Sequence, residues 1–441
     1  MESVHKKLLS GFGSRDAILT DFYSPERLND LVNAVANSNS QFVPRGGGNS
    51  YGNIAIATKG QTISTLKLNR ICDWAPDYSW IRVQSGIQIG RLLASLIEVD
   101  CSLPVVPGAA SATIGGCIAM DVHGKNSYSV GSFGQHVTEI ELITSSGIVQ
   151  CSPTSNSDLF WKTVGGMGST GVIYSATLSL LTNTSPMIQV NTNYAYSLEE
   201  LLNLVRLKAI DNEFCYAWMD PMQEKSKFGR GMVWSANRVK SSQNFAIRPN
   251  KKSSLNLPRN PVSLGKVPSK VISQTLWTGF SQGVDKSIIE HELSFHFPFS
   301  KVKNWERIYG HAGFIEKHFV IPYVCAGDVI TRILDARKKY NVGSFFVGLK
   351  CFGTSSKGVT SFFSEGISIA IQYSLTTGAT LFTQDINELV SSTGGEEYLA
   401  KSQNEPSIPS ILSSNQRTKL MTNLDFSYIS TNALLSRMYL V

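Results

Sequence analysis

Residues 107–126 read PGAASATIGGCIAMDVHGKN, and a second glycine-rich stretch, PRGGGNSYGN, occupies residues 44–53. Neither has the spacing of a Walker loop or the strand–GxGxxG–helix context of a Rossmann fold. Both place small residues where the backbone must approach a ligand closely. The glycines of the shorter loop permit positive φ and N–H groups that converge on a pyrophosphate without a lysine. Two such loops predict a large, flat, phosphate-bearing cofactor, for which we expect FAD.

Length and composition set the class of protein around these loops. A chain of 441 residues exceeds one ordinary core, so two domains are expected. The seven cysteines are scattered without a CxxC pair, which predicts buried thiols in a reducing compartment and neither a disulfide framework nor a metal site. The first residues lack the apolar region of a secretory signal, and no apolar run is long enough for a transmembrane helix. We therefore expect a cytoplasmic protein.

The composition and the pattern of expected secondary structure change near residue 183. Residues 1–183 are rich in glycine and short strands without regular βαβ alternation, and residues 138–150 (TEIELITSSGIVQ) predict a β-hairpin that turns at Ser146-Gly147. Residues 184–392 alternate strand-like with helix-like runs, which predicts an antiparallel sheet with helices on one face. The expected fold class is α+β, with an FAD-binding domain, an α+β substrate (cap) domain, and residues 393–441 returning to the first domain.

Positive charge is concentrated in residues 225–270, which hold eleven Lys and Arg and no Asp or Glu. The Pro- and Ser-rich run in this segment predicts a long mobile loop. It is interpreted either as a solvated surface loop or as a contact for anionic lipid headgroups or a phosphorylated substrate, which would place the protein peripherally on the inner membrane face. A nucleic-acid partner is not expected, because the segment lacks interleaved aromatic residues and any known nucleic-acid module.

Three stretches resemble the FAD-binding domain of the vanillyl-alcohol oxidase superfamily, the PCMH type. They are RGGGNSYGN (45–53), PVVPGAASATIGGCIAMDVHGKNSYSVGSFGQHV (104–137) and LFWKTVGGMGSTGVI (159–173). Within the superfamily, the chain is most similar to the decaprenylphosphoryl-β-D-ribose 2-oxidase-like FAD oxidoreductases. Shorter matches recur later, in FCYAWMD (214–220), AGFIEKHFVIP (312–322), GLKCFG (348–353), GGEEYLAKS (394–402) and LDFSYIS (424–430). The resemblance implies an FAD-dependent oxidoreductase that acts on CH–OH groups.

The resemblance also implies which residues hold the cofactor. In many relatives a histidine of the first loop bonds covalently to the flavin, but here that position is Asn49, so we expect FAD to be held non-covalently. The expected cofactor-binding residues are Arg45, Gly46, Gly47, Gly48, Asn49, Ser50, Tyr51, Gly52, Asn53, Gly108, Thr113, Ile114, Gly115, Gly116, Met120, Asp121, His123, Ile173 and Tyr398.

Three residues are implied to be catalytic: Lys401, His123 and Tyr51. A cation at Lys401 would stabilise the negative charge of a reduced flavin, or accept a proton if the lysine were desolvated beside another cation. His123 would orient the substrate hydroxyl or deprotonate it, because imidazole titrates near neutrality. Tyr51 would lie near both flavin and substrate.

The substrate pocket implied by the resemblance departs from the family. Glu316 and His318 stand where the family tends to carry glutamine, and the family's Asn-x-Cys-x-Asp strand reads Ser368, Ala370 and Gln372. The expected substrate is a polyprenyl-phosphate- or nucleotide-linked sugar, oxidised to a keto-sugar that a short-chain reductase partner would reduce to complete an epimerisation. An aldonolactone or polyol oxidase, and a redox-inactive flavoprotein scaffold, remain open alternatives. The expected substrate-binding residues are Lys125, Trp218, Glu316, His318, Lys350 and Gln372.

Overall fold

The computed structural model describes residues 4–14, 17–37, 41–224, 227–240, 255–258, 264–281, 286–298, 302–311 and 313–402, together with 418, 422 and 423. About half of the basic segment predicted over residues 225–270, and most of the C-terminal segment beyond residue 402 with its LDFSYIS stretch, lie outside the described residues.

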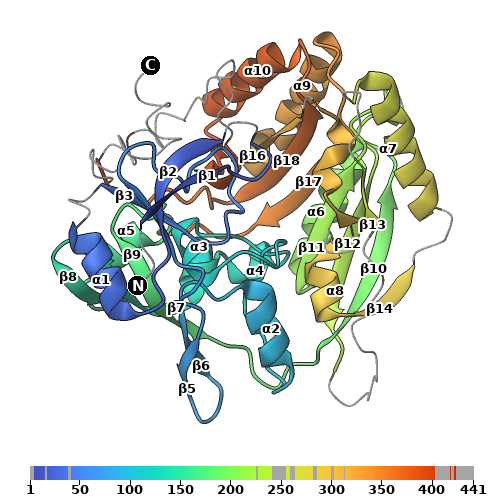
Figure 1. The fold of residues 1–441 in the computed structure, drawn as a ribbon. Helices are drawn as coiled ribbons and strands as arrows, with labels where there is room; N and C mark the ends of the chain where they lie inside the picture. Colours follow the sequence, from blue (N-terminus) through green and yellow to red (C-terminus); the bar gives the residue numbers. More distant parts are fainter. Residues whose placement is uncertain are drawn as a thin grey trace.

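The N-terminal part of the chain forms two small sheets (Figure 1). The first has four strands in the order β1-β2-β4-β3 and the second has five in the order β5-β6-β9-β7-β8. The strands are β1 (His5–Leu9), β2 (Ile18–Tyr23), β3 (Phe42–Arg45), β4 (Gln61–Ser64), β5 (Ile71–Trp74), β6 (Trp80–Gln84), β7 (Val137–Thr144), β8 (Gly147–Cys151) and β9 (Val172–Ser179). The helices of this part are α1 (Leu28–Asn37), α2 (Ile89–Ile97), α3 (Ile114–Ala119), α4 (Ser127–Val130), η1 (Phe133–His136) and α5 (Ser157–Thr163).

The predicted hairpin is confirmed, because β7 and β8 pair antiparallel with Thr144 opposite Gly147. Gly147 has φ of +115°, a conformation that favours glycine at this turn.

The second part of the chain is organised around one eight-stranded sheet in the order β14-β10-β12-β11-β17-β18-β16-β19, in which every pair is antiparallel. Its strands are β10 (Met187–Ala195), β11 (Phe214–Met219), β12 (Gly231–Arg238), β14 (Ser287–His291), β16 (Phe314–Ile321), β17 (Phe346–Phe352), β18 (Gly366–Ser374) and β19 (Glu396–Glu397). Two short strands, β13 (Leu255–Asn256) and β15 (Val302–Lys303), pair separately. The helices are α6 (Leu198–Asp211), α7 (Lys266–Ser281), α8 (Glu292–His296), η4 (Trp305–Tyr309), η5 (Tyr323–Cys325), α9 (Ala326–Lys339), α10 (Ala379–Ser392) and η6 (Leu399–Lys401).

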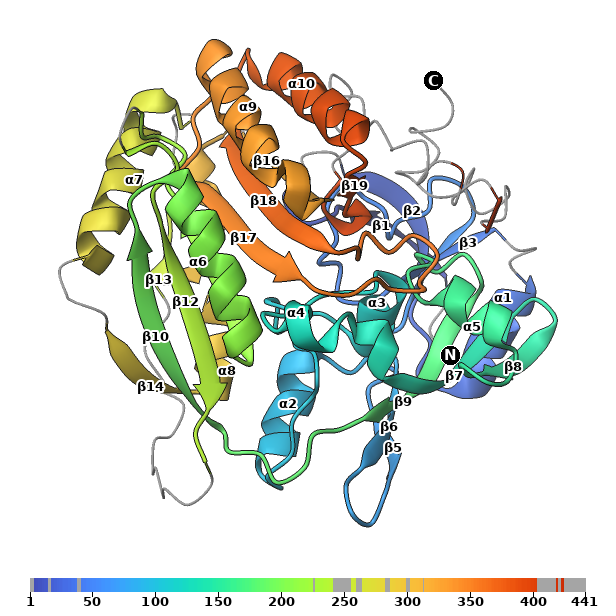
Figure 2. The same cartoon turned by 180° about the vertical axis from the view of Figure 1, so that it is seen from behind.

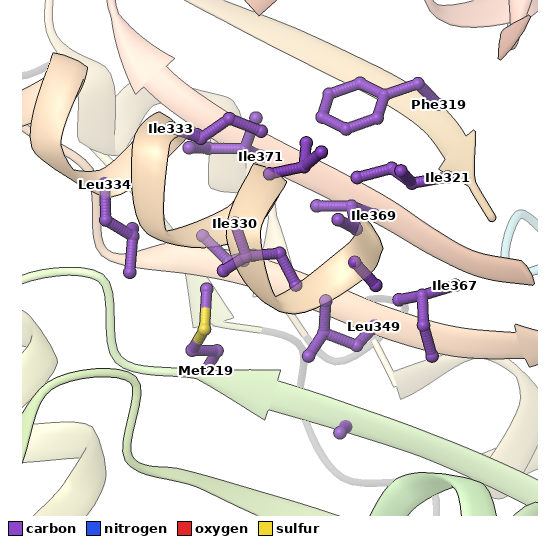
Figure 3. Packing of buried hydrophobic residues seen from close by; sticks show 14 of the residues in the cluster. Met219, Phe319, Ile321, Ile330, Ile333, Leu334, Leu349, Ile367, Ile369 and Ile371 are labelled. Carbon is purple, nitrogen blue, oxygen red and sulfur yellow. The ribbon is translucent and has the colours of Figure 1, made fainter. Parts of the chain in front are cut away.

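One face of this sheet carries the main hydrophobic core. Helices α6, α9 and α10 cover that face (Figure 2), where alternate residues of β18 (Ile367, Ile369 and Ile371) meet Ile330 and Ile333 of α9 (Figure 3). The expectation of helices on one face only is wrong, because α7 and α8 pack against the opposite face. There Trp277 of α7 joins Trp218 and Met232, while Phe295 of α8 joins Phe214 and Ala236. Side chains alternate between the two faces of a strand, so each strand contributes to both.

The cysteines are all free where the structure describes them, and five of the seven are buried. Cys72 is exposed, contrary to the expectation of buried thiols, because it lies on the exposed strand β5. Within the described ranges, no helix is both long enough and apolar enough to cross a bilayer.

Candidate active site

The candidate site lies on the sheet face opposite α9 and α10, and strand alternation explains its composition. Glu316 and His318 are two residues apart on β16, while Ile315 and Phe319, which flank the pair, face the helix-covered core. Lys350 on β17 and Gln372 on β18 follow the same pattern, because Leu349 and Ile371 next to them belong to that core. In the antiparallel register, Glu316 stands opposite Gln372 and Lys350 opposite Ser368. Residues far apart in the sequence are thereby placed on one surface.

The two glycine-rich loops lie against each other. A Cβ added at Gly46 would come within 2.1 Å of Thr113 Oγ1, and one at Gly47 within 2.2 Å of the Ser111 carbonyl oxygen. Ser111 also donates a hydrogen bond of 2.7 Å to Asn49 Oδ1. The small residues of the first loop are therefore required for this close approach.

Thr113 fixes the start of α3. It is the N-cap residue, and its hydroxyl accepts a hydrogen bond of 3.3 Å from the Gly116 N–H. Gly115 lies so close to Ser85 that an added Cβ would stand 2.8 Å from the serine Cβ. Ile114 is fully buried in the core of the five-stranded sheet, which anchors the loop.

The residues present at the two loops fit FAD. The Asn49 Nδ2 atom is buried without a hydrogen-bond partner among the described residues, so it is a donor available to a ligand. Gly48 and Gly52 have φ of +66° and +64°, and Gly108 faces open space where a side chain would project. A dinucleotide can therefore approach the backbone here.

His123 and Lys350 are in direct contact. Lys350 Nζ lies 3.0 Å from His123 Nδ1, and the His123 ring makes an edge contact with the His318 ring at 5.0 Å between centroids. Burial, and then the neighbouring Lys350, hold the pKa of His123 well below its usual value. Burial, with the charges of Lys350 and Lys401 adding to it, does the same to the pKa of His318. Both imidazoles are therefore neutral near pH 7.

His318 keeps one nitrogen available. Its Nε2 lies 2.8 Å from Ser368 Oγ, whereas its Nδ1 is buried and has no partner among the described residues. The rings of Phe362 and Tyr398 enclose the two histidines, and they stack on each other at 4.5 Å.

Lys401 and Tyr51 meet at Glu316. Lys401 Nζ lies 3.3 Å from Glu316 Oε1 and 4.1 Å above the ring of Tyr51. Glu316 Oε2 accepts hydrogen bonds from the Tyr51 hydroxyl at 3.0 Å and from Gln372 Nε2 at 2.6 Å. Tyr309 in turn donates to Gln372 Oε1 at 3.0 Å. Both oxygens of the only carboxylate in this network are thus engaged.

Two predicted substrate residues lie apart from this cluster. Lys125 donates to the Phe295 carbonyl, and its ammonium lies over the Phe295 and Tyr216 rings at 4.0 and 4.5 Å. Trp218 is on the site face of β11, but its Nε1 donates to the Phe345 carbonyl at 3.0 Å and its ring packs against Trp277.

Several predicted cofactor residues make contacts within the protein. Arg45 donates to the Ser10 carbonyl at 3.0 Å, and Asn53 Oδ1 accepts from the Gly11 N–H. Asp121 has φ of +43° and accepts hydrogen bonds from the Gly134 N–H and the Ser356 hydroxyl. The contacts of Arg45 and Asn53 tie the N-terminal segment to the loop, and the bond from Ser356 ties Asp121, after α3, to the second part of the chain.

Three other predicted cofactor residues lie in hydrophobic clusters, and the first loop contacts the C-terminal turn. Ile173 lies in the core of the five-stranded sheet, and Met120 packs against the cluster that holds Tyr398. The Tyr51 N–H donates to the Ala400 carbonyl at 2.8 Å, and the Ser50 carbonyl accepts from Phe12.

Sequence reasoning missed Tyr309, Phe352 and Phe362. Alternation could have identified Phe352, because it stands two residues after Lys350 on the same strand. Tyr309 and Phe362 lie in segments with no motif, and only tertiary packing brings them to Gln372 and His123.

Comparison with known proteins identifies the first domain. The model of the FAD binding domain family matches residues 22–152. Decaprenylphosphoryl-β-D-ribose oxidase from Mycolicibacterium smegmatis is 28% identical over 410 residues, which cover 90% of this chain and 88% of that protein. D-arabinono-1,4-lactone oxidase from Yarrowia lipolytica is 23% identical over 240 residues, covering 53% of this chain and 44% of that protein. Human Δ(24)-sterol reductase is 30% identical over 102 residues, which cover 23% of this chain and 20% of that protein.

The fold, the loops and these similarities define an FAD-dependent oxidoreductase that acts on a CH–OH group. Residues 22–152 match an FAD binding domain, and over nearly its whole length the chain is similar to decaprenylphosphoryl-β-D-ribose oxidase.

Proposed function

We propose that this chain oxidises a secondary hydroxyl of a sugar carried on a polyprenyl phosphate or a nucleotide, giving a keto-sugar. The observation that carries the proposal is the placement of His123, at the end of the second FAD loop, against Lys350 and His318 of the substrate sheet. A ligand held at the loops would bring its reactive ring next to groups that can bind and deprotonate an alcohol.

Bound FAD supplies the hydride acceptor. The Asn49 amide and the backbone of residues 46–48 and 113–116 would hold it, and Asn49 cannot form the covalent link of a histidine. Lys401, kept in place by Glu316, supplies positive charge beside Tyr51. His123 orients the substrate hydroxyl and takes its proton, because its imidazole is neutral and enclosed by aromatic rings.

The similarity to decaprenylphosphoryl-β-D-ribose oxidase supports a lipid-linked sugar. Glu316, His318, Ser368 and Gln372 change the hydrogen-bonding groups of the pocket, and one lost or moved polar partner costs ~1–3 kcal/mol. We therefore propose that the reaction is oxidation of a secondary hydroxyl on a carrier-linked sugar, and that this sugar differs from ribose. Peripheral contact with the inner membrane face and a short-chain reductase that consumes the keto-sugar belong to the same proposal.

A second candidate is oxidation of a soluble aldonolactone, which the similarity to D-arabinono-1,4-lactone oxidase favours. Oxygen-free, FAD-loaded protein is mixed in turn with decaprenylphosphoryl-β-D-ribose, a panel of polyprenyl-phosphoryl and nucleotide-linked sugars, and D-arabinono-1,4-lactone. The loss of the visible absorbance of the oxidised flavin is then followed. We expect bleaching by a carrier-linked sugar. Bleaching by the lactone alone selects the second candidate, and bleaching by none supports a redox-inactive scaffold.

A further inference from the structure

Lys350 lies in the candidate site without an ion pair to any described carboxylate. Its Nζ contacts His123 Nδ1 at 3.0 Å, and no described carboxylate lies within ion-pairing distance of it. Glu316 is the acidic group of this surface, but Lys401, Tyr51 and Gln372 already occupy its two oxygens. The polar partner of Lys350 is therefore the imidazole of His123, which is itself a base.

The environment of Lys350 favours the neutral amine. Burial, followed by repulsion from Lys401, lowers the pKa of Lys350 from 10.5 to about 7, with Glu316 opposing the shift. A group with a folded pKa near 7 is protonated below that pH and neutral above it. Near neutrality, a substantial fraction of Lys350 can therefore accept a proton.

The contacts of His123 indicate which nitrogen carries its hydrogen. Nδ1 lies 3.4 Å from the Gly124 carbonyl oxygen, which can only accept, and 3.0 Å from Lys350 Nζ. With Lys350 neutral, an Nδ1–H donor satisfies both neighbours and leaves the lone pair on Nε2. His123 would then present a base on one side of the ring and a donor to Lys350 on the other.

We propose that Lys350 is the final proton acceptor of the oxidation and acts through His123, an inference that rests on the proposed function. The substrate O–H bond breaks and its proton binds Nε2 of His123, while the Nδ1 proton passes to Nζ of Lys350. The electron pair left on oxygen forms the second C–O bond as the carbon loses its hydride to the oxidised cofactor. Lys350 ends as ammonium, and the alcohol ends as ketone.

The other basic groups that face Lys350 are less suited to this role. Lys401 is paired with Glu316, and His318 has its Nε2 at the Ser368 hydroxyl. Tyr398 is buried, and burial raises its pKa well above the usual value, so it stays protonated. The titratable groups around the pair of His123 and Lys350 are therefore His318 and Glu316 from β16, with Tyr398 and Lys401 from the segment that follows β19.

An equilibrium titration tests the neutral lysine without any substrate. FAD-loaded protein carrying 13C at the lysine Cε is titrated by NMR, and the resonance of Lys350 is identified by its loss in Lys350→Met. We expect a midpoint near 7. A midpoint near 10.5 overturns the inference. Glu316→Gln should move the midpoint to lower pH, because removal of the negative charge disfavours the ammonium, and a midpoint that stays in place also counts against it.

The kinetic test uses the carrier-linked sugar that bleaches the flavin in the screen above. The reduction rate of the wild type should rise with pH to a plateau with a midpoint near 7. Lys350→Met should lower the plateau roughly 100-fold and remove this dependence. Lys350→Arg, which retains size and charge but cannot accept a proton, should be equally slow.

The exposed Lys338→Met, on α9, is the matched control and should keep the wild-type profile. A Lys350→Arg variant as fast as the wild type overturns the inference, because it shows that only a cation is needed. If no sugar reduces the flavin, the proposed function fails, while a titration midpoint near 10.5 refutes the proton-acceptor role alone.

Discussion

Glu316 Oε1 lies 3.3 Å from Lys401 Nζ, and this pair joins strand β16 to the turn η6 that follows β19. The other carboxylate oxygen is held by Tyr51 and Gln372, so the acid cannot rotate away without losing two hydrogen bonds. Lys401 is thereby fixed above the Tyr51 ring, at the edge of the first glycine-rich loop.

Replacement of this cation should separate cofactor binding from chemistry. In Lys401→Met, we expect FAD to remain bound but the rate of flavin reduction by substrate to fall about 100- to 1,000-fold, because a preorganised charge at the developing anion is lost. Rapid mixing under anaerobic conditions measures the rate, and the flavin-to-protein absorbance ratio measures occupancy. An unchanged rate would remove Lys401 from the catalytic assignment.

Asn49 leads to a second prediction, on the attachment of the cofactor. Acid precipitation of the loaded protein should leave all flavin in the supernatant, because an amide forms no bond to the isoalloxazine. Asn49→Ala should weaken FAD binding roughly 2- to 10-fold, the value of one hydrogen bond, since its buried Nδ2 has no partner in the part of the chain that the structure describes. Fluorescence titration of the apoprotein gives the affinity. A yellow protein pellet would contradict the non-covalent model.

A third prediction concerns the contact between the two loops. Gly46→Ala places a methyl group 2.1 Å from Thr113 Oγ1, a distance that forces the loops apart. We expect FAD affinity to fall at least tenfold, with a smaller loss of thermal stability. The matched variant is Gly279→Ala on α7, where the methyl group meets open space and removes a helical glycine, so stability should stay the same or rise slightly. Equal effects of the two substitutions would contradict a special role for the loop contact.

The sequence alone was sufficient to predict strands of the large sheet and the class of cofactor. Residues 366–374 (GISIAIQYS) alternate apolar with small or polar side chains, which predicts a strand with Gln372 on the face opposite Ile369 and Ile371, because a strand has only two faces. Small residues in the loops predict close approach of a ligand to the backbone, and in the structure Gly46 also lets the two loops meet at Thr113.

The pairing of side chains could not be derived in the same way. Whether Lys350 meets an acid or a base depends on how a loop of one domain docks on a strand of the other, and local patterns do not encode that docking. Lys125, two residues from His123, lies over Phe295 of α8, so proximity in sequence did not predict its neighbours. Helices α7 and α8 on the second face were missed, because α8 is short and α7 begins at Lys266, inside the basic segment that was wrongly predicted to be a loop throughout.

A buried polar cluster between the domains leads to the fourth prediction. Glu292 accepts hydrogen bonds from Ser102 of the first domain at 2.6 Å and from Arg238 of the second at 2.7 Å. Although burial opposes it, hydrogen bonding from His296 and Arg238 lowers the pKa of Glu292 to about 2. Burial lowers the pKa of His296 to about 4.

Both shifts make the protein sensitive to acid. Glu292 has a folded pKa below its unfolded value, so its contribution is full above about pH 4.5 and is lost as the pH falls towards 2. His296 is neutral when folded, so the unfolded chain binds protons first as the pH falls from 6.5 to about 4, and stability is lost there too. The melting temperature should therefore begin to fall near pH 6.5 and continue to fall below pH 4.5.

Glu292→Gln should lower the free energy of unfolding at pH 7 by roughly 1–3 kcal/mol, because the buried Arg238 loses its bond to the Glu292 carboxylate and keeps its ion pair with Glu213. The variant should also lose most of the acid dependence below pH 4.5, since the titrating group is gone. Glu26→Gln, which removes an exposed partner of Lys67, is the control and should change little. Thermal melts of the three proteins between pH 3 and 8 measure both effects. If Glu292→Gln melts like the control throughout, the cluster does not hold the two domains together.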